Sequence, residues 1–385
     1  MQNIARIQSP RIIRIGGGIA SETGEVLHQL GLSKPLIVTD TNLIKIGHVK
    51  TLTDILEAAN IHAKIFDGVI EDPTDTCVDD GITALNAGDF DCIIGFGGGS
   101  PMDTAKAISF MAVNAGHVRD YKAPLQIDKC GLPIILIPTT GGTGSELTRW
   151  CVITDTKQPE KYNLSGLACV ATAALIDWTF TTTKPARITA DTAVDSLTHA
   201  IEAYVSKRAH PYTDAFALSA MPLIADNVRT AYSDPENGPA REALMLAASQ
   251  AGMAFSNASV ALVHGMSRPI GAHFHVAHGL SNAMLLPAVT AFSVTSAPTR
   301  YAQVAKVMNW ATNKDSDKTA CAKLVAGLKQ LNADLEVPSP TKLGHVKDDR
   351  MFALMASQAL ASGSPQNNPK VPTTDEIIQL YHEMW

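Results

Sequence analysis

The 385-residue sequence is poor in charged and aromatic side chains and has no long apolar run. Charged residues make up 18% of the chain, below the ~25% of an average globular protein, whereas hydrophobic residues make up 45%, which predicts a compact fold and excludes a disordered one. No stretch approaches the ~18 consecutive apolar residues of a membrane-spanning helix. The net charge of -6 lacks the basic excess that binds nucleic acid or anionic membranes, so we expect a small-molecule partner, no nucleic acid and no membrane.

The six cysteines are scattered along the chain and form no CxxC pair. A chain of this length does not need disulfides to stabilise its cores, so we expect reduced thiols and a cytoplasmic location. Residues 1–20 contain arginines but no apolar segment of the kind found in signal peptides, which leads us to expect neither secretion nor membrane insertion.

The chain changes its pattern halfway. From Arg11 to about Asp177, short apolar runs alternate with amphipathic segments, which predicts an N-terminal α/β domain with a doubly wound, mostly parallel sheet. The expected strands are 11–15, 35–39, 62–66, 92–96 and 132–137, and the clearest expected helices are 43–60, 74–86 and 101–113. Beyond Lys184, segments with a 3.6-residue period predict an all-helical C-terminal domain, with helices at 191–207, 212–232, 239–256 and 278–293. The expected domains are therefore 1–183 and 184–385.

Two glycine-rich segments follow expected strands. The first, GFGGGSP at 95–101, leads into a helix, where backbone N–H groups and the helix N-terminus favour a phosphate; a purely structural turn is the alternative. It matches neither GxGxxG nor a Walker loop. The second, PTTGGTGSE at 138–146, lies at the same sheet edge, so the two together favour a dinucleotide. Asp40, at the end of another strand, is placed to accept hydrogen bonds from a ribose and favours NAD over NADP; its alternative role is that of a helix cap.

Candidate metal ligands occur in the second half. Asp195 and His199 are four residues apart on one face of an expected helix and suit a divalent cation, although a salt bridge or a solvated face has the same pattern. Further on, four of the twelve histidines fall within fifteen residues, namely His264, His273, His275 and His278. Spacing alone does not choose among the last three.

Four motifs in this order resemble the iron-containing, group III alcohol dehydrogenase family: GGGSPMDTAKA, IPTTGGTGSELT, DSLTHAIEAY and HGMSRPIGAHFHVAHGLSNAMLLP. The likeness runs from about Arg11 to the C-terminus, and it implies a dehydroquinate synthase-like arrangement of the two domains. It also implies a metal held by one aspartate and three histidines, which fall on Asp195, His199, His264 and His278. His273 and His275 then have roles beside the metal site. The implied cofactor-binding positions are Asp40, Gly98, Gly99, Ser100, Asp103, Thr139, Thr140, Thr143 and Lys161.

The reaction that this resemblance implies is reversible hydride transfer between a primary alcohol or diol and the nicotinamide of NAD, in the cleft between the two domains. The metal would polarise the substrate oxygen. Nitrogen and oxygen ligands suit Fe(II), Zn(II), Mn(II) and Ni(II) alike, so the expectation of Fe(II), with Zn(II) as the alternative, comes from the resemblance. Because the family contains dimers and larger rings, we also expect a homo-oligomer.

One departure from the family's pattern bears on the chemistry. Many members have a second histidine four residues after the first in HGMxHP, where this chain has Arg268. A guanidinium does not relay protons as an imidazole does, so the proton would leave through His273, a ribose hydroxyl or water. Arg268 could instead bind a substrate carboxylate, which makes a hydroxy acid such as 4-hydroxybutyrate an alternative substrate. An internal ion pair of Arg268 is the competing interpretation.

Two other functions are compatible with the same two-domain architecture. A metal- and NAD-dependent lyase resembling dehydroquinate synthase would share the two domains, but the HGMSRP and PTTGGTGSE segments argue against it. A non-catalytic metal or nucleotide sensor would need both sites and no turnover. Serine-hydrolase chemistry has no support because the sequence lacks GxSxG.

Overall fold

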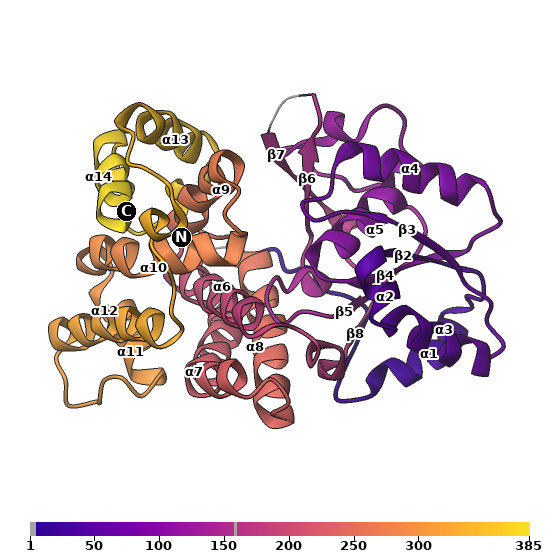
Figure 1. Cartoon of the computed structure of the whole chain (residues 1–385), viewed down its shortest axis with the longest axis horizontal. Coiled ribbons are helices and arrows are strands. Elements are labelled where there is room, and N and C mark those ends of the chain that lie inside the picture. The colour runs from indigo at the N-terminus through magenta and orange to yellow at the C-terminus, as the bar shows by residue number, and fades with distance from the viewer. Residues whose placement is uncertain (1–4, 158–159) are drawn as a thin grey trace. The chain divides into compact units, whose positions relative to one another are not determined.

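The computed structural model describes residues 5–157 and 160–385. These residues form two compact units, the first comprising Ile7–Thr183 and the second comprising Lys184–Trp385 together with Ala5 and Arg6. The first unit contains a sheet covered by helices, and the second unit is helical (Figure 1). The α/β class and the helical class predicted for the two halves are confirmed.

The first unit is built on a six-stranded parallel sheet with the order β1-β8-β5-β4-β2-β3. The strands are β1 (Ile12–Ile15), β2 (Pro35–Asp40), β3 (Lys64–Val69), β4 (Cys92–Gly97), β5 (Ile134–Pro138) and β8 (Ala173–Ile176). Strands β4 and β5 are buried along their whole length, which explains their continuous apolar sequence. A parallel sheet places the ends of these strands, and the loops that follow them, at one edge.

Helices cover both faces of this sheet. They are α1 (Thr23–Leu30), α2 (Thr41–Lys45), α3 (His48–Ala58), α4 (Asp75–Asn86) and α5 (Gly99–Met111). Alternate residues of one strand enter different cores: Ile93 packs with Ile108 of α5, whereas Ile94 packs with Leu52 of α3. The sheet is therefore doubly wound, as its sequence pattern predicts.

Several details of the first unit differ from the sequence-based expectations. The expected helix 43–60 is two helices, α2 and α3, because Gly47 adopts a left-handed conformation with φ of 86°. Helix α5 begins at Gly99, two residues before the expected start at Pro101. Strands β6 (Trp150–Asp155) and β7 (Glu160–Ser165) form an antiparallel hairpin outside the main sheet, which the sequence pattern does not predict.

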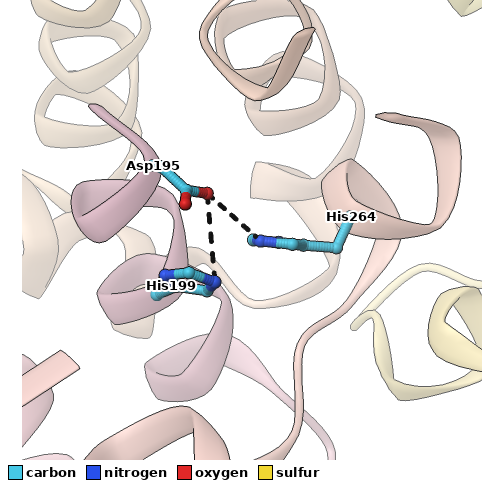
Figure 2. Close-up of side chains that lie close together, drawn as sticks. All are labelled: Asp195, His199 and His264. Atoms are coloured by element: carbon cyan, nitrogen blue, oxygen red, sulfur yellow. Dashed lines mark ion pairs between the residues drawn. The ribbon is translucent and has the colours of Figure 1, made fainter. Parts of the chain in front are cut away.

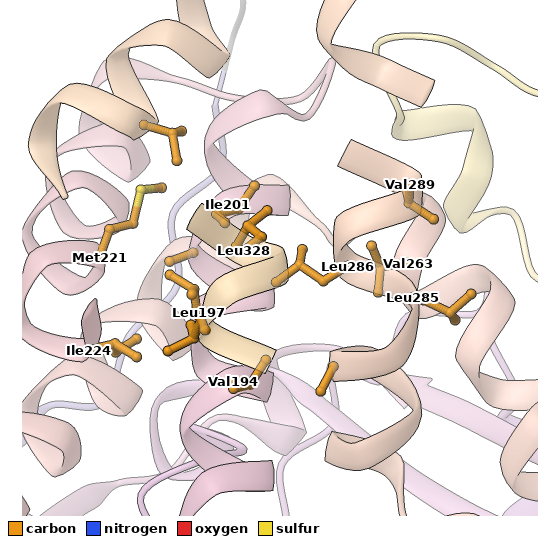
Figure 3. Packing of buried hydrophobic residues seen from close by; sticks show 14 of the residues in the cluster. Val194, Leu197, Ile201, Met221, Ile224, Val263, Leu285, Leu286, Val289 and Leu328 are labelled. Carbon is orange, nitrogen blue, oxygen red and sulfur yellow. The ribbon is translucent and has the colours of Figure 1, made fainter. Parts of the chain in front are cut away.

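The second unit is organised around α6 (Ala186–Val205), which is buried along most of its length. Val194, Leu197 and Ile201 of α6 lie in the centre of its apolar core (Figure 3). The surrounding helices are α7 (Pro211–Ser233), α8 (Gly238–Ala258), α9 (Leu262–Phe274), α10 (His278–Ser293), α11 (Pro298–Val307), α12 (Asp317–Asp334), α13 (Asp349–Ala361) and α14 (Thr374–Met384). Among the helices of the described residues, none is by itself long and apolar enough to cross a membrane, although the bent pair α8 and α9 passes that test of length and composition.

Candidate functional site

Four side chains converge in the helical unit. Asp195 and His199 come from α6, His264 comes from α9, and His278 is the first residue of α10. Asp195 Oδ1 lies 3.9 Å from Nε2 of His199, 3.4 Å from Nε2 of His264 and 3.8 Å from Nε2 of His278. Figure 2 shows the first three side chains pointing toward one another from the two helices. The structure thus brings together the four residues that the resemblance implies as metal ligands.

Close packing of the helices produces this arrangement. A Cβ atom on Gly279 would lie 2.4 Å from the carbonyl oxygen of Asp191, so only glycine allows the start of α10 to lie directly against α6. The ring of His199 stacks between those of Phe255 and His264, with centroids 4.1 Å and 4.5 Å away. These contacts fix the ring planes and direct the donor atoms toward one point.

A buried glutamate, Glu202, contacts the ring nitrogen of His264 that does not face Asp195. Nδ1 of His264 lies 2.6 Å from Oε2 of Glu202, which also accepts a hydrogen bond from the backbone N–H of Ala261 at 2.9 Å. Oε1 of Glu202 accepts the N–H of Val263 at 2.6 Å. Because an ionised carboxylate only accepts, the proton of His264 is on Nδ1, and Nε2 faces Asp195.

The charges at this site favour a cation. Burial lowers the pKa of His264, but Glu202 and Asp195 outweigh burial and raise it to about 9. Burial raises the pKa of the Asp195 carboxyl, yet the three adjacent imidazoles lower it well below its usual range. Two buried carboxylates therefore stabilise positive charge at the point where the four donors meet.

The donor set passes a geometric test for a divalent metal. Four donors about 2.1 Å from a metal ion in a tetrahedral arrangement lie about 3.4 Å from one another. The donor atoms of Asp195, His199 and His264 all lie within 4.8 Å of one another, and Nε2 of His278 has the distance to Asp195 given above. A side-chain exposure of 42% at His278 leaves this side of the site open to a small molecule.

Asn282, one turn after His278, borders the same site. Its amide nitrogen donates to Oδ1 of Asp195 at 2.6 Å and lies 3.2 Å from Nε2 of both His264 and His278. Asn282 and Glu202 are the two residues of this site to which the sequence-based analysis gave no role. Their spacing carried a signal, because Glu202 lies three residues after His199 and Asn282 four residues after His278, so each shares a helix face with a predicted ligand.

The remaining candidates on and after α9 have other contacts. Nε2 of His273 is 2.8 Å from Oε1 of Gln358 in α13. His275 is exposed and ends α9 with a left-handed φ of 53°. Arg268 lies one turn after His264 and donates to Oγ of Ser364 at 3.0 Å. The competing interpretation of Arg268, an internal ion pair, is wrong for the described residues, since none of their carboxylates pairs with it.

The glycine-rich segments of the first unit lie against each other at the edge of the sheet. Gly98 is the N-cap of α5, and Gly99 and Ser100 form its first turn. The N–H of Thr139 donates to the carbonyl of Gly97 at 2.8 Å, and a Cβ atom on Gly99 would lie 3.0 Å from Cγ2 of Thr143.

Two hydroxyls of the second segment support a ligand at this edge. Oγ1 of Thr139 and Oγ1 of Thr140 are buried without a hydrogen-bond partner among the described residues. Such hydroxyls, next to the N-terminus of a 13-residue helix, fit the pyrophosphate of a dinucleotide.

Asp103 and Lys106 connect α5 to the second segment. Asp103 accepts a hydrogen bond from Oγ of Ser145 at 2.7 Å and from the N–H of Val152 at 2.9 Å. Nζ of Lys106, which is fully buried, donates to the carbonyl and the hydroxyl of Ser145 at 2.8 Å and 2.7 Å. Both carboxylate oxygens of Asp103 therefore have protein partners, and the two residues hold the segment in place.

The other two expected cofactor positions lie at different places. Asp40 caps α2, since its Oδ1 accepts the N–H of Leu43 at 3.0 Å, which leaves the second carboxylate oxygen for a ribose. Its strand pairs with β4 in a register that sets Val38, two residues before Asp40, opposite Gly95 at the start of the first glycine-rich segment. Lys161, on β7, forms an ion pair of 2.6 Å with Asp72.

Family models match both halves of the chain. Residues 10–178 match the model described as iron-containing alcohol dehydrogenase, and residues 189–385 match the C-terminal model of the Fe-containing alcohol dehydrogenase family.

Individual proteins show the same similarity along the whole chain. The NAD-dependent methanol dehydrogenase of Bacillus methanolicus is 36% identical over 366 residues, which is 95% of this chain and 96% of that protein. A solved structure of a 1,3-propanediol oxidoreductase aligns with a TM-score of 0.96 at 35% identity, covering 99% of this chain and 100% of that one. The structure of sulfoacetaldehyde reductase from Bifidobacterium kashiwanohense in complex with NAD+ aligns with a TM-score of 0.90 at 26% identity, covering 99% of this chain and 98% of that one.

Proposed function

The chain belongs to the iron-containing alcohol dehydrogenase family, and from this premise we propose which of its residues hold the cofactors and act on the substrate. The protein is an alcohol dehydrogenase that uses NAD and a divalent metal, iron, for reversible hydride transfer between an alcohol and nicotinamide. The family assignment favours this reaction over the lyase and sensor alternatives.

The metal ligands in this proposal are Asp195, His199, His264 and His278. The observation that carries the assignment is the set of distances, between 3.4 Å and 3.9 Å, from Oδ1 of Asp195 to the three Nε2 atoms. When bound, a divalent metal supplies Lewis-acid chemistry, because it lowers the pKa of a hydroxyl and polarises a carbonyl oxygen. Asp195 contributes one negative charge and the imidazoles contribute none, so the ligand set leaves net positive charge to stabilise a negative substrate oxygen.

The residues that would hold NAD lie in the unit Ile7–Thr183, and the unit that contains Lys184–Trp385 would hold the metal and the substrate. Gly98, Gly99 and Ser100 would bind the pyrophosphate through the N-terminus of α5. The unpartnered hydroxyls of Thr139 and Thr140 support this placement. The further positions in the proposal are Asp40 for the adenosine ribose, Asp103 of α5, Thr143 of the second glycine-rich segment and Lys161 of β7.

The substrate in this proposal is a small molecule with a primary hydroxyl or an aldehyde group. The names of the relatives, which include a methanol dehydrogenase and a 1,3-propanediol oxidoreductase, support a short carbon chain. An imidazole both takes and gives protons near neutral pH, which keeps His273 as the candidate for the proton step, whereas Arg268 serves binding.

The proposed setting is cytoplasmic, and the proposed assembly is a homo-oligomer. The six cysteines are all free thiols in the structure, which supports a reducing compartment. Light scattering during size-exclusion chromatography tests the oligomer, and a single peak at the monomer mass of 40.9 kDa would contradict it.

The experiment that tests the enzyme proposal uses metal-free protein reconstituted anaerobically with Fe(II) or Zn(II). NADH formation is followed with primary alcohols, diols and hydroxy acids, for the native chain and for the Asp195→Asn and His199→Ala variants. We expect turnover that depends on the metal and falls by at least about a hundredfold in both variants. Equal turnover with and without metal, or in the variants, would contradict the assigned ligands.

A further inference from the structure

Arg268 differs from Arg241, a buried arginine of the same helical unit. Arg241 is buried, and its guanidinium donates to Oγ1 of Thr189 and to two backbone carbonyls. Arg268 is partly buried, and within the described residues its one hydrogen bond goes to the neutral hydroxyl of Ser364. Most of its five N–H donors therefore have no protein acceptor.

Among the residues that the structure describes, no carboxylate forms an ion pair with Arg268. The acidic side chain whose charge reaches it is Glu202, but the carboxylate oxygens of Glu202 are already engaged by Nδ1 of His264 and by two backbone N–H groups. Burial lowers the pKa of Arg268, and Glu202 opposes this only in part. Arg241 also lacks an acidic partner, but three neutral acceptors satisfy its guanidinium. A partly buried cation with neither an acidic partner nor such a set of acceptors is costly for a folded protein, so the presence of Arg268 calls for a ligand that supplies acceptors and negative charge.

The position of Arg268 relates this charge to the metal site. Arg268 follows His264 by one turn of α9, which corresponds to a rise of about 6 Å along the helix. A molecule of three or four carbons spans a similar distance from a terminal hydroxyl to a group at its other end. Arg268 is thus placed to bind the far end of a short substrate whose hydroxyl lies at the metal site.

We propose that Arg268 binds an anionic oxygen group of the substrate, a carboxylate, so that the enzyme acts on short ω-hydroxy acids and their semialdehydes. This inference rests on the proposed function. The charges of the site agree with this proposal. The formal charges of a divalent metal, Asp195, Glu202 and Arg268 add up to one positive charge, which a substrate carboxylate neutralises. The planar guanidinium presents two parallel N–H groups that match the two carboxylate oxygens.

The test compares two substrates that differ only at the far end, 4-hydroxybutyrate and 1-butanol. The native enzyme is expected to have the higher kcat/KM for 4-hydroxybutyrate. Arg268→Gln is expected to lose about 10- to 100-fold on 4-hydroxybutyrate and clearly less on 1-butanol, because a hydrogen bond to a charged group is removed. Arg268→Lys keeps the positive charge but loses the pair of parallel N–H groups. Its kcat/KM for 4-hydroxybutyrate is expected to lie between those of the native enzyme and of Arg268→Gln.

A matched control variant removes the positive charge of an arginine at another position of the helical unit. Arg229 of α7 pairs with Asp334 and is 40% exposed, so Arg229→Gln is expected to leave both kcat/KM values as in the native enzyme. Equal losses on both substrates in Arg268→Gln, or a native preference for 1-butanol, would overturn the proposal and leave the dehydrogenase function intact.

A binding measurement separates the two proposals. Butyrate, which carries the carboxylate and no hydroxyl, is titrated into the native protein and into Arg268→Gln, and its binding is followed by ligand-observed NMR. Weaker binding to the variant supports the anion site even if no alcohol is oxidised, in which case only the proposed function fails. Equal binding to both proteins overturns the anion site. Isethionate provides a sulfonate arm: a preference for it over 4-hydroxybutyrate that is lost in Arg268→Gln would support an anion site at Arg268 but overturn the carboxylate as its occupant.

Discussion

Glu202 and His264 form a buried pair in which Oε2 of Glu202 lies 2.6 Å from Nδ1 of His264. The partners belong to different helices, α6 and α9, and the carboxylate also fixes the first turn of α9 through the N–H groups of Ala261 and Val263. One side chain thus determines both the position of α9 and the orientation of the imidazole that it carries. Glu202 is therefore a positioning residue of the proposed metal centre.

The first prediction concerns Glu202→Gln. The amide keeps the size of the side chain but loses the charge that orients and polarises His264, so the metal dissociation constant is expected to rise by about 10- to 100-fold. Competition with a chromogenic chelator measures the constant. Glu242→Gln, an exposed change on α8, is the control and should leave it unaltered. An unchanged constant in Glu202→Gln would show that Glu202 only stabilises the fold.

The second prediction distinguishes His278 from His275, which spacing alone does not separate. His278→Ala is expected to lower the bound metal per chain, as measured by elemental analysis after dialysis, because one of four donors is lost. His275→Asn is expected to retain the metal, and asparagine tolerates the left-handed conformation at that position. Loss of metal in His275→Asn at unchanged thermal stability would contradict the assignment.

Much of the fold was predictable because the central strands carry an unambiguous signal. Strands β4 and β5 are apolar on both faces, which in a chain that alternates strands and helices requires helices on both sides of the sheet. The β6–β7 hairpin was not predicted from its pattern, since it lies outside the main sheet and its second strand, β7, is mostly polar. Helix α9 was not predicted either, because Gly265, Pro269 and Gly271 are poor helix formers, so that tertiary contacts must maintain the helix.

The four proposed metal ligands show which part of the site local sequence patterns do not predict. The pair of Asp195 and His199 follows from one helix, but the choice of His278 depends on where α9 ends and on the contact of Gly279 with Asp191, which joins positions 88 residues apart (279 minus 191). Only the resemblance to a family supplied that choice from the sequence. The contact of His273 with Gln358 lies equally beyond local reasoning, because it joins α9 to α13.

The third prediction concerns the choice between NAD and NADP. Asp40→Ser keeps a side-chain oxygen that can cap α2 but removes the negative charge that would repel a 2′-phosphate. The ratio of kcat/KM for NAD to that for NADP is expected to fall by about tenfold. Thermal unfolding should be nearly unchanged, since serine is a good N-cap. An unaltered ratio would show that Asp40 serves as a cap only.

The fourth prediction concerns Lys106, whose fully buried ammonium group donates to the carbonyl and hydroxyl of Ser145 and to the carbonyl of Trp150. Lys106→Met leaves these acceptors, and the nearby carboxylate of Asp103, without their cation. The free energy of unfolding is expected to fall by about 2 to 4 kcal/mol, as measured by urea denaturation. Lys50→Met removes an exposed lysine paired with Asp54 and should cost less than about 0.5 kcal/mol.

A double-mutant cycle shows whether Lys106 acts together with Asp103. Nζ of Lys106 lies 3.6 Å from Oδ1 of Asp103, and Ser145 bonds to both side chains. Since a buried charge without its partner costs more than a neutral pair, Lys106→Met combined with Asp103→Asn is expected to be more stable than the sum of the single changes predicts, by about 0.5 to 3 kcal/mol. The KM for NAD should rise in Lys106→Met, because Ser145 belongs to the second glycine-rich segment. Additive stabilities together with an unchanged KM would mean that the two residues neither act as a unit nor hold that segment for the cofactor.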